Sequence, residues 1–303
     1  QMSEVPERLV VVGGGYIGLE LGLVYAGLGS QVTVVEFFPE LLPGADADLV
    51  DVMVKSVRGR LSQVLLRSKV VGTEETKGGV NVTVEHEGEK KVLETDRVLV
   101  SVGRRPNTDD LGLEKIGLEL DERGRIPTDE TGKTAAKDIY AIGDVTAGPM
   151  LAHKASREAK VVAEAIAGEP SAFDNRAIPA VVYTDPEIAW AGLTEREAEE
   201  KGIDVKIGRF PLVPLGRART LGRTDGLVKV IVRPDNGLVL GVGMVGPHAS
   251  ELIAEGTLAL EMGATVEDLM VTIHPHPTLS EAVMEAADVA AGMPVHINPP
   301  KKK

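Results

Sequence analysis

Residues 9–18 read Leu9-Val10-Val11-Val12-Gly13-Gly14-Gly15-Tyr16-Ile17-Gly18, a short apolar run followed by a G-x-G-x-x-G turn. The apolar run predicts a buried strand, and the turn opens a predicted helix that ends at about Gly27. A second strand, from Gln31 to Val35, ends on the acidic residue Glu36. Strand, glycine turn, helix and strand in this order indicate a βαβ unit of the Rossmann type.

The three glycines have separate roles in a dinucleotide site. Gly13 permits the tight turn, Gly15 lets main-chain amides approach a pyrophosphate, and Gly18 lets the helix pack closely on the strand. Glu36 favours bonds to both ribose hydroxyls and repels a 2′-phosphate, which favours NAD over NADP. An exposed acid at a strand end is the alternative for Glu36, and a solvated acid on a helix face is the alternative for Glu20.

Composition excludes several classes of protein. The 303 residues suffice for two or three domains, and 43% of them are hydrophobic. No run approaches the roughly 18 apolar residues that span a bilayer, and the first residues lack a signal-peptide layout, so we expect a cytoplasmic protein, or a mitochondrial matrix protein in a eukaryote. The net charge of −13 argues against binding nucleic acid or anionic membranes. Cysteine is absent, so these residues carry no thiol chemistry.

The remainder of the first predicted domain, residues 1–106, contains one more helix and a β-rich section. The helix is expected over residues 47–61, and residues 80–85 and 91–94 form a predicted hairpin. A strand over residues 97–102 returns to the sheet and ends on Gly103-Arg104-Arg105-Pro106-Asn107. The two guanidinium groups there suit a phosphate or a neighbouring domain, and structural salt bridges are the alternative.

Residues 107–172 form the second predicted domain. A strand from Asp138 is expected to end on Gly143-Asp144, and a helix is expected from about Leu151 to Ala167. Asp144 can accept bonds from polyol hydroxyls, and the helix N-terminus can stabilise negative charge on a bound ring. An ordinary strand–turn–helix is the alternative. The segment has too few strands to close a sheet, so we expect it to be the return half of a larger domain.

Residues 173–303 group strands and helices without βαβ alternation, which predicts an α+β domain. A helix capped by Thr194 and Glu197 precedes a hairpin of residues 227–232 and 238–245, and a helix follows over residues 250–262. The six histidines lack the spacing of a zinc site, so no metal is expected.

The stretch His274-Pro275-His276-Pro277-Thr278-Leu279-Ser280-Glu281 brings an imidazole and a carboxylate to the start of a helix. Thr278 and Glu281 form a predicted capping box, which is the structural interpretation of Glu281. The catalytic interpretation is that Glu281 also accepts a hydrogen bond from His276, which fixes the tautomer and raises the basicity of the ring.

Together these motifs resemble those of the dihydrolipoyl dehydrogenase family, within the FAD-dependent pyridine nucleotide-disulfide oxidoreductases. The similarity extends from Glu4 to at least Gly292 and corresponds to the C-terminal two-thirds of such enzymes. The matching motifs are Gly13 to Glu20, Gly103 to Asn107, Ile139 to Asp144, Met150 to Ala155 and His276 to Glu281. The resemblance implies a Rossmann-like NAD-binding domain (residues 1–106), part of an FAD-binding domain (107–172) and an α+β dimerisation domain (173–303).

The resemblance also implies roles for single residues. It implies that NAD contacts Gly13, Gly15, Gly18, Glu36, Val70 and Gly103, with Glu20 near the nicotinamide. It implies that Asp144 binds the ribityl chain of FAD, and that the main chain of Leu151 and Ala152 contacts the flavin ring. His276 is then the acid–base residue, and Glu281 orients it.

The implied reaction oxidises dihydrolipoamide, carried on an acyltransferase or carrier protein of a 2-oxo acid dehydrogenase complex, with NAD as acceptor in a homodimer. Members of the family begin with an FAD-binding glycine motif and a Cys-x-x-x-x-Cys disulfide, and neither occurs in these residues. We therefore expect that the chain lacks this N-terminal part and is inactive alone. The alternatives are a non-catalytic NAD-binding and dimerisation fragment, or another NAD(P)-disulfide reductase.

Overall fold

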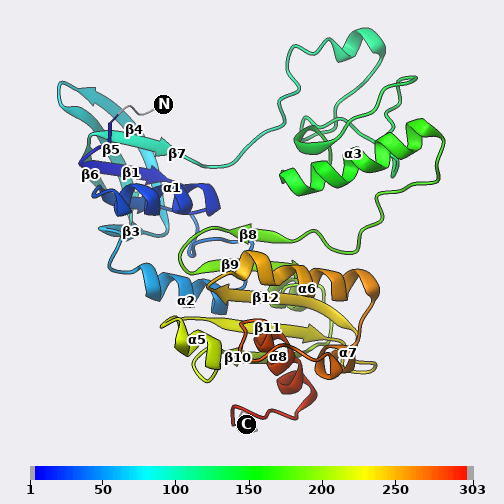
Figure 1. Ribbon diagram of the computed structural model, residues 1–303. Helices are drawn as coiled ribbons and strands as arrows, with labels where there is room; N and C mark the ends of the chain where they lie inside the picture. The colour runs from blue at the N-terminus through cyan, green and yellow to red at the C-terminus, as the bar shows by residue number, and fades with distance from the viewer. Residues whose placement is uncertain (1–3, 299–303) are drawn as a thin grey trace. The chain divides into compact units, whose positions relative to one another are not determined.

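A computed structural model describes residues 4–298 (Figure 1). The chain divides into two compact units, one built from the residues up to 102 together with those from 179 onward, and the other from residues 103–178. Residues 299–303 of the predicted third domain lie outside the described residues. No helix among the described residues combines the length and apolar character needed to cross a membrane.

The predicted βαβ unit is confirmed. It consists of β1 (Arg8–Val12), α1 (Tyr16–Gly27) and β2 (Gln31–Val35), with β1 and β2 parallel and in register from Arg8↔Gln31 to Val12↔Val35. The parallel sheet is completed by β3 (Gln63–Leu65) and β7 (Arg97–Val100), in the order β3-β2-β1-β7. Every residue of β1 between its two ends is buried, as expected for the centre of a parallel sheet.

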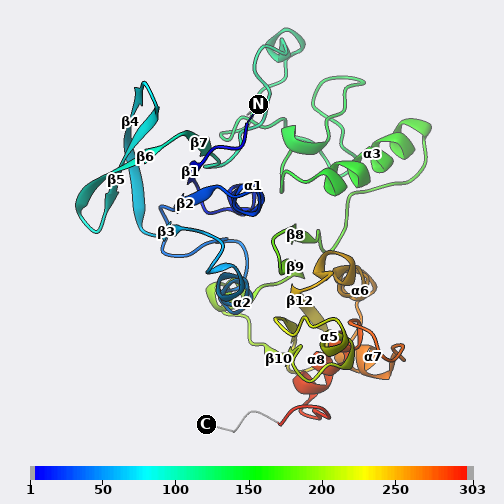
Figure 2. The same cartoon turned by 60° about the vertical axis from the view of Figure 1, so that its left-hand side comes forward.

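Two predicted boundaries in this region are wrong. Helix α2 (Ala47–Val57) ends four residues before the predicted Leu61, because the chain turns at Arg60 and places Leu61 in the core, where it is 8% exposed. Strand β7 ends at Val100, two residues before the prediction, and Val102 is 72% exposed. The predicted hairpin is confirmed as part of a three-stranded antiparallel sheet of β4 (Ser68–Thr76), β5 (Gly79–His86) and β6 (Glu89–Thr95), which Figure 2 shows as a separate layer.

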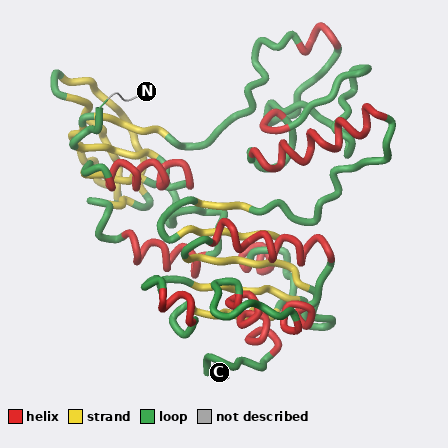
Figure 3. The backbone as a smooth tube through the Cα atoms, viewed as in Figure 1, coloured by secondary structure: helices red, strands yellow, loops and turns green. Residues whose placement is uncertain are grey.

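The unit of residues 103–178 is mostly loop, with two short 3-10 helices, η1 (Leu113–Ile116) and η2 (Gly143–Val145), and the helix α3 (Ala152–Ala167) (Figure 3). The predicted strand from Asp138 is not formed. Within this unit the only pairing is the isolated bridge between Lys133 and Tyr140. A small cluster of three buried apolar residues, Leu118, Ile126 and Ala136, forms its core.

The α+β arrangement predicted after residue 173 is confirmed. One antiparallel sheet has the order β10-β11-β12-β9-β8, and its strands are β8 (Ala180–Val182), β9 (Glu187–Gly192), β10 (Lys206–Pro211), β11 (Leu227–Val232) and β12 (Val239–Gly246). Its helices are α4 (Glu195–Glu200), α5 (Gly216–Thr220), α6 (Ala249–Met262), α7 (Val266–Val271) and α8 (Glu281–Ala291). The predicted capping box of Thr194 and Glu197 is present.

One hydrophobic cluster joins the first and third parts of the chain. Leu49 and Met53 on α2 belong to the same buried cluster as Ile188 on β9 and Val245 on β12. Burial of this shared surface stabilises α2 against the antiparallel sheet, since apolar area removed from water contributes about 25 cal/mol per Å². The dinucleotide turn and the His276–Glu281 segment are therefore parts of one compact unit.

Candidate functional site

In the glycine turn before α1, two glycines pack against main-chain atoms too closely for a side chain, and a third faces open space. Gly13 has a φ of +108°, and a Cβ there would lie 2.4 Å from the carbonyl oxygen of Ser101. A Cβ on Gly18 would lie 2.1 Å from the carbonyl oxygen of Gly13. A Cβ on Gly15, in contrast, would meet no atom within 4 Å, and no side chain caps the helix that Gly15 begins. The turn thus leaves space at the N-terminus of a helix, where an anionic group can bind.

Glu36 lies beneath this turn and is 6% exposed. Its carboxylate accepts hydrogen bonds from the main-chain amides of Gly14, at 2.5 Å, and Phe38, at 2.8 Å. The alternative that Glu36 is an exposed acid at a strand end is therefore wrong. A carboxylate has about four acceptor positions, so the predicted ribose contacts remain compatible with both amide bonds.

The other residues assigned to NAD have different surroundings. Glu20 on α1 accepts a hydrogen bond from the main-chain amide of Tyr183, at 2.9 Å. Val70 lies on β4 at an irregularity of the β4–β5 pairing and packs against the cluster that contains Val82 and Val84. Gly103, with a φ of +126°, begins the second compact unit. The structure thus brings Gly13, Gly15, Gly18 and Glu36 together, and the contact of Gly103 with NAD stays a prediction.

Asp144 and the two arginines of the Gly103–Asn107 motif belong to the unit of residues 103–178. Arg104 lies 3.6 Å from Asp144 and donates to the carbonyl oxygen of Met150 at 2.6 Å. Arg105 pairs with Asp109 at 2.5 Å. The salt-bridge interpretation of both arginines is confirmed, whereas the predicted phosphate contact stays untested.

Helix α3 begins after Leu151, and the side chain at this N-cap position forms no cap hydrogen bond. The side chain of Asp144 is 52% exposed, so its carboxylate can still accept bonds from hydroxyl groups. An accessible carboxylate and an uncapped helix N-terminus are the donor and acceptor types that a ribityl chain and an electron-rich ring require. The residues of this chain that the resemblance assigns to FAD therefore fit that group.

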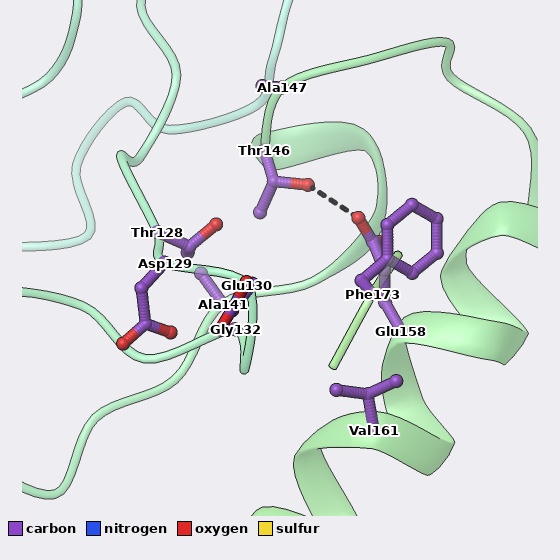
Figure 4. A pocket seen from close by; sticks show the side chains of 10 residues that line it. All are labelled: Thr128, Asp129, Glu130, Gly132, Ala141, Thr146, Ala147, Glu158, Val161 and Phe173. Atoms are coloured by element: carbon purple, nitrogen blue, oxygen red, sulfur yellow. Dashed lines mark hydrogen bonds between the residues drawn. The ribbon is translucent and has the colours of Figure 1, made fainter. Parts of the chain in front are cut away.

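A buried ion pair on α3 holds the segment of residues 143–146 against this helix. This pair was not predicted from the sequence. The ammonium of Lys154 lies 2.8 Å from Glu158 and donates to Thr146 at 3.0 Å. The other oxygen of Glu158 accepts the amide of Gly143 at 2.7 Å. Glu158 and Thr146 also line a pocket of about 230 Å³ beside Phe173 (Figure 4). The only sequence signal was the Lys–Glu spacing of four residues, which is common on exposed helix faces.

The expected contact between His276 and Glu281 is present. Nδ1 of His276 lies 2.8 Å from Oε1 of Glu281, the first residue of α8. The side chain of His276 is 76% exposed, whereas that of Glu281 is 14% exposed. The predicted capping box is only half formed, because the amide of Thr278 donates to Glu281 at 2.8 Å but its hydroxyl donates to the carbonyl oxygen of Pro275. The residue at the N-cap position of α8 is Ser280 instead.

The electrostatics of this pair suit a base. Burial opposes ionisation of Glu281, but the hydrogen bonds from the Thr278 amide and the His276 ring outweigh it and lower the pKa of Glu281 below its ordinary value. Glu281 is therefore an anion at neutral pH, and an anion at Nδ1 assigns the proton of a neutral ring to Nδ1. This leaves the lone pair of Nε2 on the exposed side of His276, where it can accept a proton.

Three carboxylates elsewhere are close enough to bind a cation: Asp46, Asp48 and Glu195. The ammonium of Lys229, 1% exposed, lies 2.6 Å from Asp46, 2.7 Å from Asp48 and 2.6 Å from Glu195. Lys229 thus occupies the position that a metal ion would take. Sequence reasoning missed this cluster because its members are far apart in the chain.

A βαβ unit with an open glycine turn and a buried acid at the end of β2 defines a dinucleotide-binding protein of the α/β class. Two family models match the chain: "Pyridine nucleotide-disulphide oxidoreductase" over residues 1–159, and its "dimerisation domain" over residues 178–287. The chain belongs to the pyridine nucleotide-disulphide oxidoreductase family.

Known relatives agree with this assignment. The chain is 50% identical to a dihydrolipoyl dehydrogenase of Geobacillus stearothermophilus over 98% of its own length and 63% of the relative. It is also 50% identical to one from Haloferax volcanii, again over 98% of this chain and 63% of the relative. The chain therefore spans about 63% of the length of these relatives.

Solved structures show the same fold. LpdA from Mycobacterium tuberculosis matches with a TM-score of 0.87 and 32% identity, over 94% of this chain and 62% of that one. The HOCl-induced flavoprotein disulfide reductase RclA from Escherichia coli matches with a TM-score of 0.84 and 29% identity, over 93% of this chain and 65% of that one.

Proposed function

We propose that a protein containing this chain oxidises dihydrolipoamide to lipoamide and passes the electrons to NAD. The observation that carries the proposal is the His276–Glu281 pair, in which a largely buried carboxylate holds an exposed ring whose second nitrogen has no hydrogen bond within residues 4–298. The 50% identity with dihydrolipoyl dehydrogenases supports this substrate class. Bound FAD would carry electrons between dithiol and nicotinamide, and sequence beyond these 303 residues would supply the redox-active disulfide.

His276 acts as the general base. The proton of a substrate thiol moves to Nε2, which gives the thiolate that attacks a disulfide. The ring then carries two protons and one positive charge, and the adjacent anion of Glu281 stabilises it. Glu281 also fixes the orientation of the ring, because its second oxygen is held by the amide of Thr278.

The glycine turn binds NAD. The amides at the start of α1 bond the pyrophosphate above the open Gly15, and Glu36 bonds the adenosine ribose. Glu20 lies near the nicotinamide, and Val70 contacts the dinucleotide. In the other unit, Asp144 bonds the ribityl chain, and the main chain at Leu151 and Ala152 lies against the flavin ring.

The match of residues 178–287 to a dimerisation domain supports a homodimer. Its physiological substrate would be the lipoyl group of an acyltransferase or carrier protein. A location in the cytoplasm, or in the mitochondrial matrix of a eukaryote, follows from this partner.

The test replaces His276 by Gln in the full-length protein. We expect dithiol oxidation to fall by roughly 10²–10⁴, the usual effect of a positioned acid–base group, while NAD binding and the unfolding midpoint are unchanged. Glu281→Ala should reduce the rate less than His276→Gln does, and lower stability by about 1 kcal/mol through the lost bond to Thr278. The matched control is His248→Asn, a change at an exposed histidine with a φ of +60° that asparagine tolerates.

Retained activity in His276→Gln would contradict the proposal. The non-catalytic alternative predicts that the full-length protein binds NAD but lacks a flavin absorption spectrum. The other alternative is a different NAD(P)-disulfide reductase. Glu36 argues against an NADP-dependent enzyme, because its charge repels the 2′-phosphate. The intact His276–Glu281 pair argues against a reductase that lacks this base. Comparing the rate of dihydrolipoamide oxidation with the rate of oxidised glutathione reduction distinguishes these enzymes.

A further inference from the structure

A second histidine–carboxylate pair lies next to the proposed base. Nε2 of His274 is 2.6 Å from Oε1 of Glu255 on α6, and its Nδ1 is 2.9 Å from the carbonyl oxygen of Thr272. The side chain of His274 is 5% exposed and that of Glu255 is 30% exposed. The pair fixes the loop that contains His276 to α6.

Both nitrogens of His274 face oxygen acceptors. A carbonyl oxygen cannot donate, so Nδ1 carries a proton. An ionised carboxylate at Nε2 also only accepts, so Nε2 carries a proton as well, and a ring that donates from both nitrogens is an imidazolium cation. His276 differs, because within the described residues only its Nδ1 is hydrogen-bonded. Two histidines separated by one proline thus have different hydrogen-bonding requirements.

The charged groups around His274 come from three elements. Glu255 faces it from α6, Glu281 lies on α8, and His276 lies in the same loop. Burial has the largest effect on the pKa of Glu281 and raises it. The contacts with Thr278 and His276 lower this pKa, and the charge of His274 lowers it further by a smaller amount. A cation at this position also disfavours a second cation at His276.

We propose that His274 and Glu255 form a permanent, partly buried ion pair that positions the His276–Glu281 pair and keeps it at its working charge. The cation helps to hold Glu281 ionised, while the opposite charge of Glu255 offsets the field of that cation at His276. His274 is a positioning residue, since it acts through Glu281 and His276. Only its effect on the rate rests on the proposed dithiol oxidation; its protonation does not.

The first measurement uses this chain and needs no activity. In ¹⁵N-detected spectra at pH 7.5, with the signals of His274 assigned by their loss in His274→Gln, we expect protons on both ring nitrogens of His274 and on one nitrogen of His276. Glu255→Gln removes the carboxylate, so His274 should then carry one proton. A neutral His274 in the unmodified chain would overturn the proposal, because the proton would then be on Glu255.

The second measurement is the pH profile of kcat/KM for dithiol oxidation in the full-length protein. His274→Gln leaves the charge of Glu255 without a partner, so we expect the acidic limb to move upward by about half a pH unit, the shift that one partly screened charge at this range produces. Glu255→Gln leaves a neutral pair, so the acidic limb should stay in place. The double variant with both changes also has no charge at these positions and should likewise leave the limb unmoved.

A merely structural role of His274 gives a different result. It would lower kcat equally in all three variants and leave the acidic limb unmoved, which would overturn the positioning role. If the unmodified protein does not oxidise dihydrolipoamide at all, the proposed function fails, but the spectra still decide the charge of His274. Circular dichroism and the unfolding midpoint show whether each variant is folded. If His274→Gln does not fold, the test rests on Glu255→Gln, which is the milder change.

Discussion

At the scale of the residue, Glu36 already uses part of its carboxylate to shape the site. It bonds the amides of Gly14 and Phe38 and is nearly buried. The turn is thus organised before a nucleotide binds, and in the proposed NAD site the carboxylate of Glu36 would lie close to the adenosine ribose. A phosphate on that ribose would approach this charge with little water to screen it.

We therefore predict that NADH binds at least tenfold more tightly than NADPH, a difference of about 1.4 kcal/mol. Fluorescence titration of the chain with both nucleotides measures it. Glu36→Gln keeps one acceptor oxygen but loses the charge, so the discrimination should shrink while the fold is retained. Equal affinities in the unmodified chain would refute the role of Glu36.

Asp288 on α8 is a residue whose charge opposes folding. Burial and the nearby charge of Glu285 raise the pKa of Asp288 above its ordinary value near 3.8, and His296 opposes them. Glu285 is itself 3% exposed and hydrogen-bonded to His296, and its second carboxylate oxygen is unpaired among the described residues. Ionised Asp288 therefore adds a second negative charge beside a buried one.

Asp288→Asn should stabilise the chain by at most about 1 kcal/mol at neutral pH. Since a raised carboxyl pKa destabilises the folded state only where the group is ionised, the gain should be absent below about pH 4 and should grow as pH rises through the folded-state pKa of Asp288. Urea unfolding at several pH values measures it, with Asp235→Asn in the exposed β11–β12 loop as control. A gain that does not vary with pH would contradict the explanation.

Single residues were predictable where their partner is near in sequence. His276 and Glu281 are five residues apart, so their contact followed from the local pattern. The hydroxyl of Thr278 was assigned wrongly, because the carbonyl oxygen of Pro275 competes for it. Lys154 and Lys229 were missed because burial of a lysine depends on carboxylates that only the folded chain assembles.

At the scale of the element, Asp46 shows how one residue can serve two helices. It occupies the N-cap position of α2 but forms no side-chain cap there. Its carboxylate instead accepts the amides of Glu195 and Arg196, at 3.2 and 3.4 Å, in the first turn of α4. Lys229 on β11 forms ion pairs with Asp46, Asp48 and Glu195, so α2, α4 and the antiparallel sheet share one ionic cluster.

Lys229→Met should destabilise this unit by about 3–5 kcal/mol, because it leaves carboxylates partly buried without their cation. Arg209 still pairs with Asp48 and Glu195, so the loss should stay within this range. Urea unfolding at pH 7 measures the effect, and Lys206→Met at an exposed position of β10 is the matched control. A loss below 1 kcal/mol would mean that the cluster adds little to stability.

Elements were predicted well where an apolar period and a turn motif coincide, as in β1, α1 and β2. Ends were less predictable. Helix α2 stops early because Leu61 joins the core instead of a helix face, and Ser62 donates its amide to Val32 on β2. The strand predicted from Asp138 failed because a strand needs a neighbour, and within residues 103–178 Tyr140 finds only Lys133.

At the scale of the whole molecule, the two units differ in how much core they contain. The larger unit has a cluster of 17 buried apolar residues that links α2, one face of β1 and β2 and the antiparallel sheet. The unit of residues 103–178 has a cluster of three. Local sequence cannot reveal this difference, because apolar residues at the right spacing predict elements whether or not a partner surface covers them.

Stability should therefore be unevenly distributed. In hydrogen exchange of this chain at pH 7, we expect slow exchange for residues 9–35, whose amides lie in a sheet and helix buried against the large core, and fast exchange for residues 108–150, which are held by turns and a small cluster. Helix α3 should be intermediate, because Lys154 and Glu158 attach its first turns to the loop at Gly143. Lys154→Met should then speed exchange in α3 and at Gly143 but not in β1 or β2, which belong to the other unit. Uniform protection along the chain would show that residues 103–178 are stable by themselves and that the small core is sufficient.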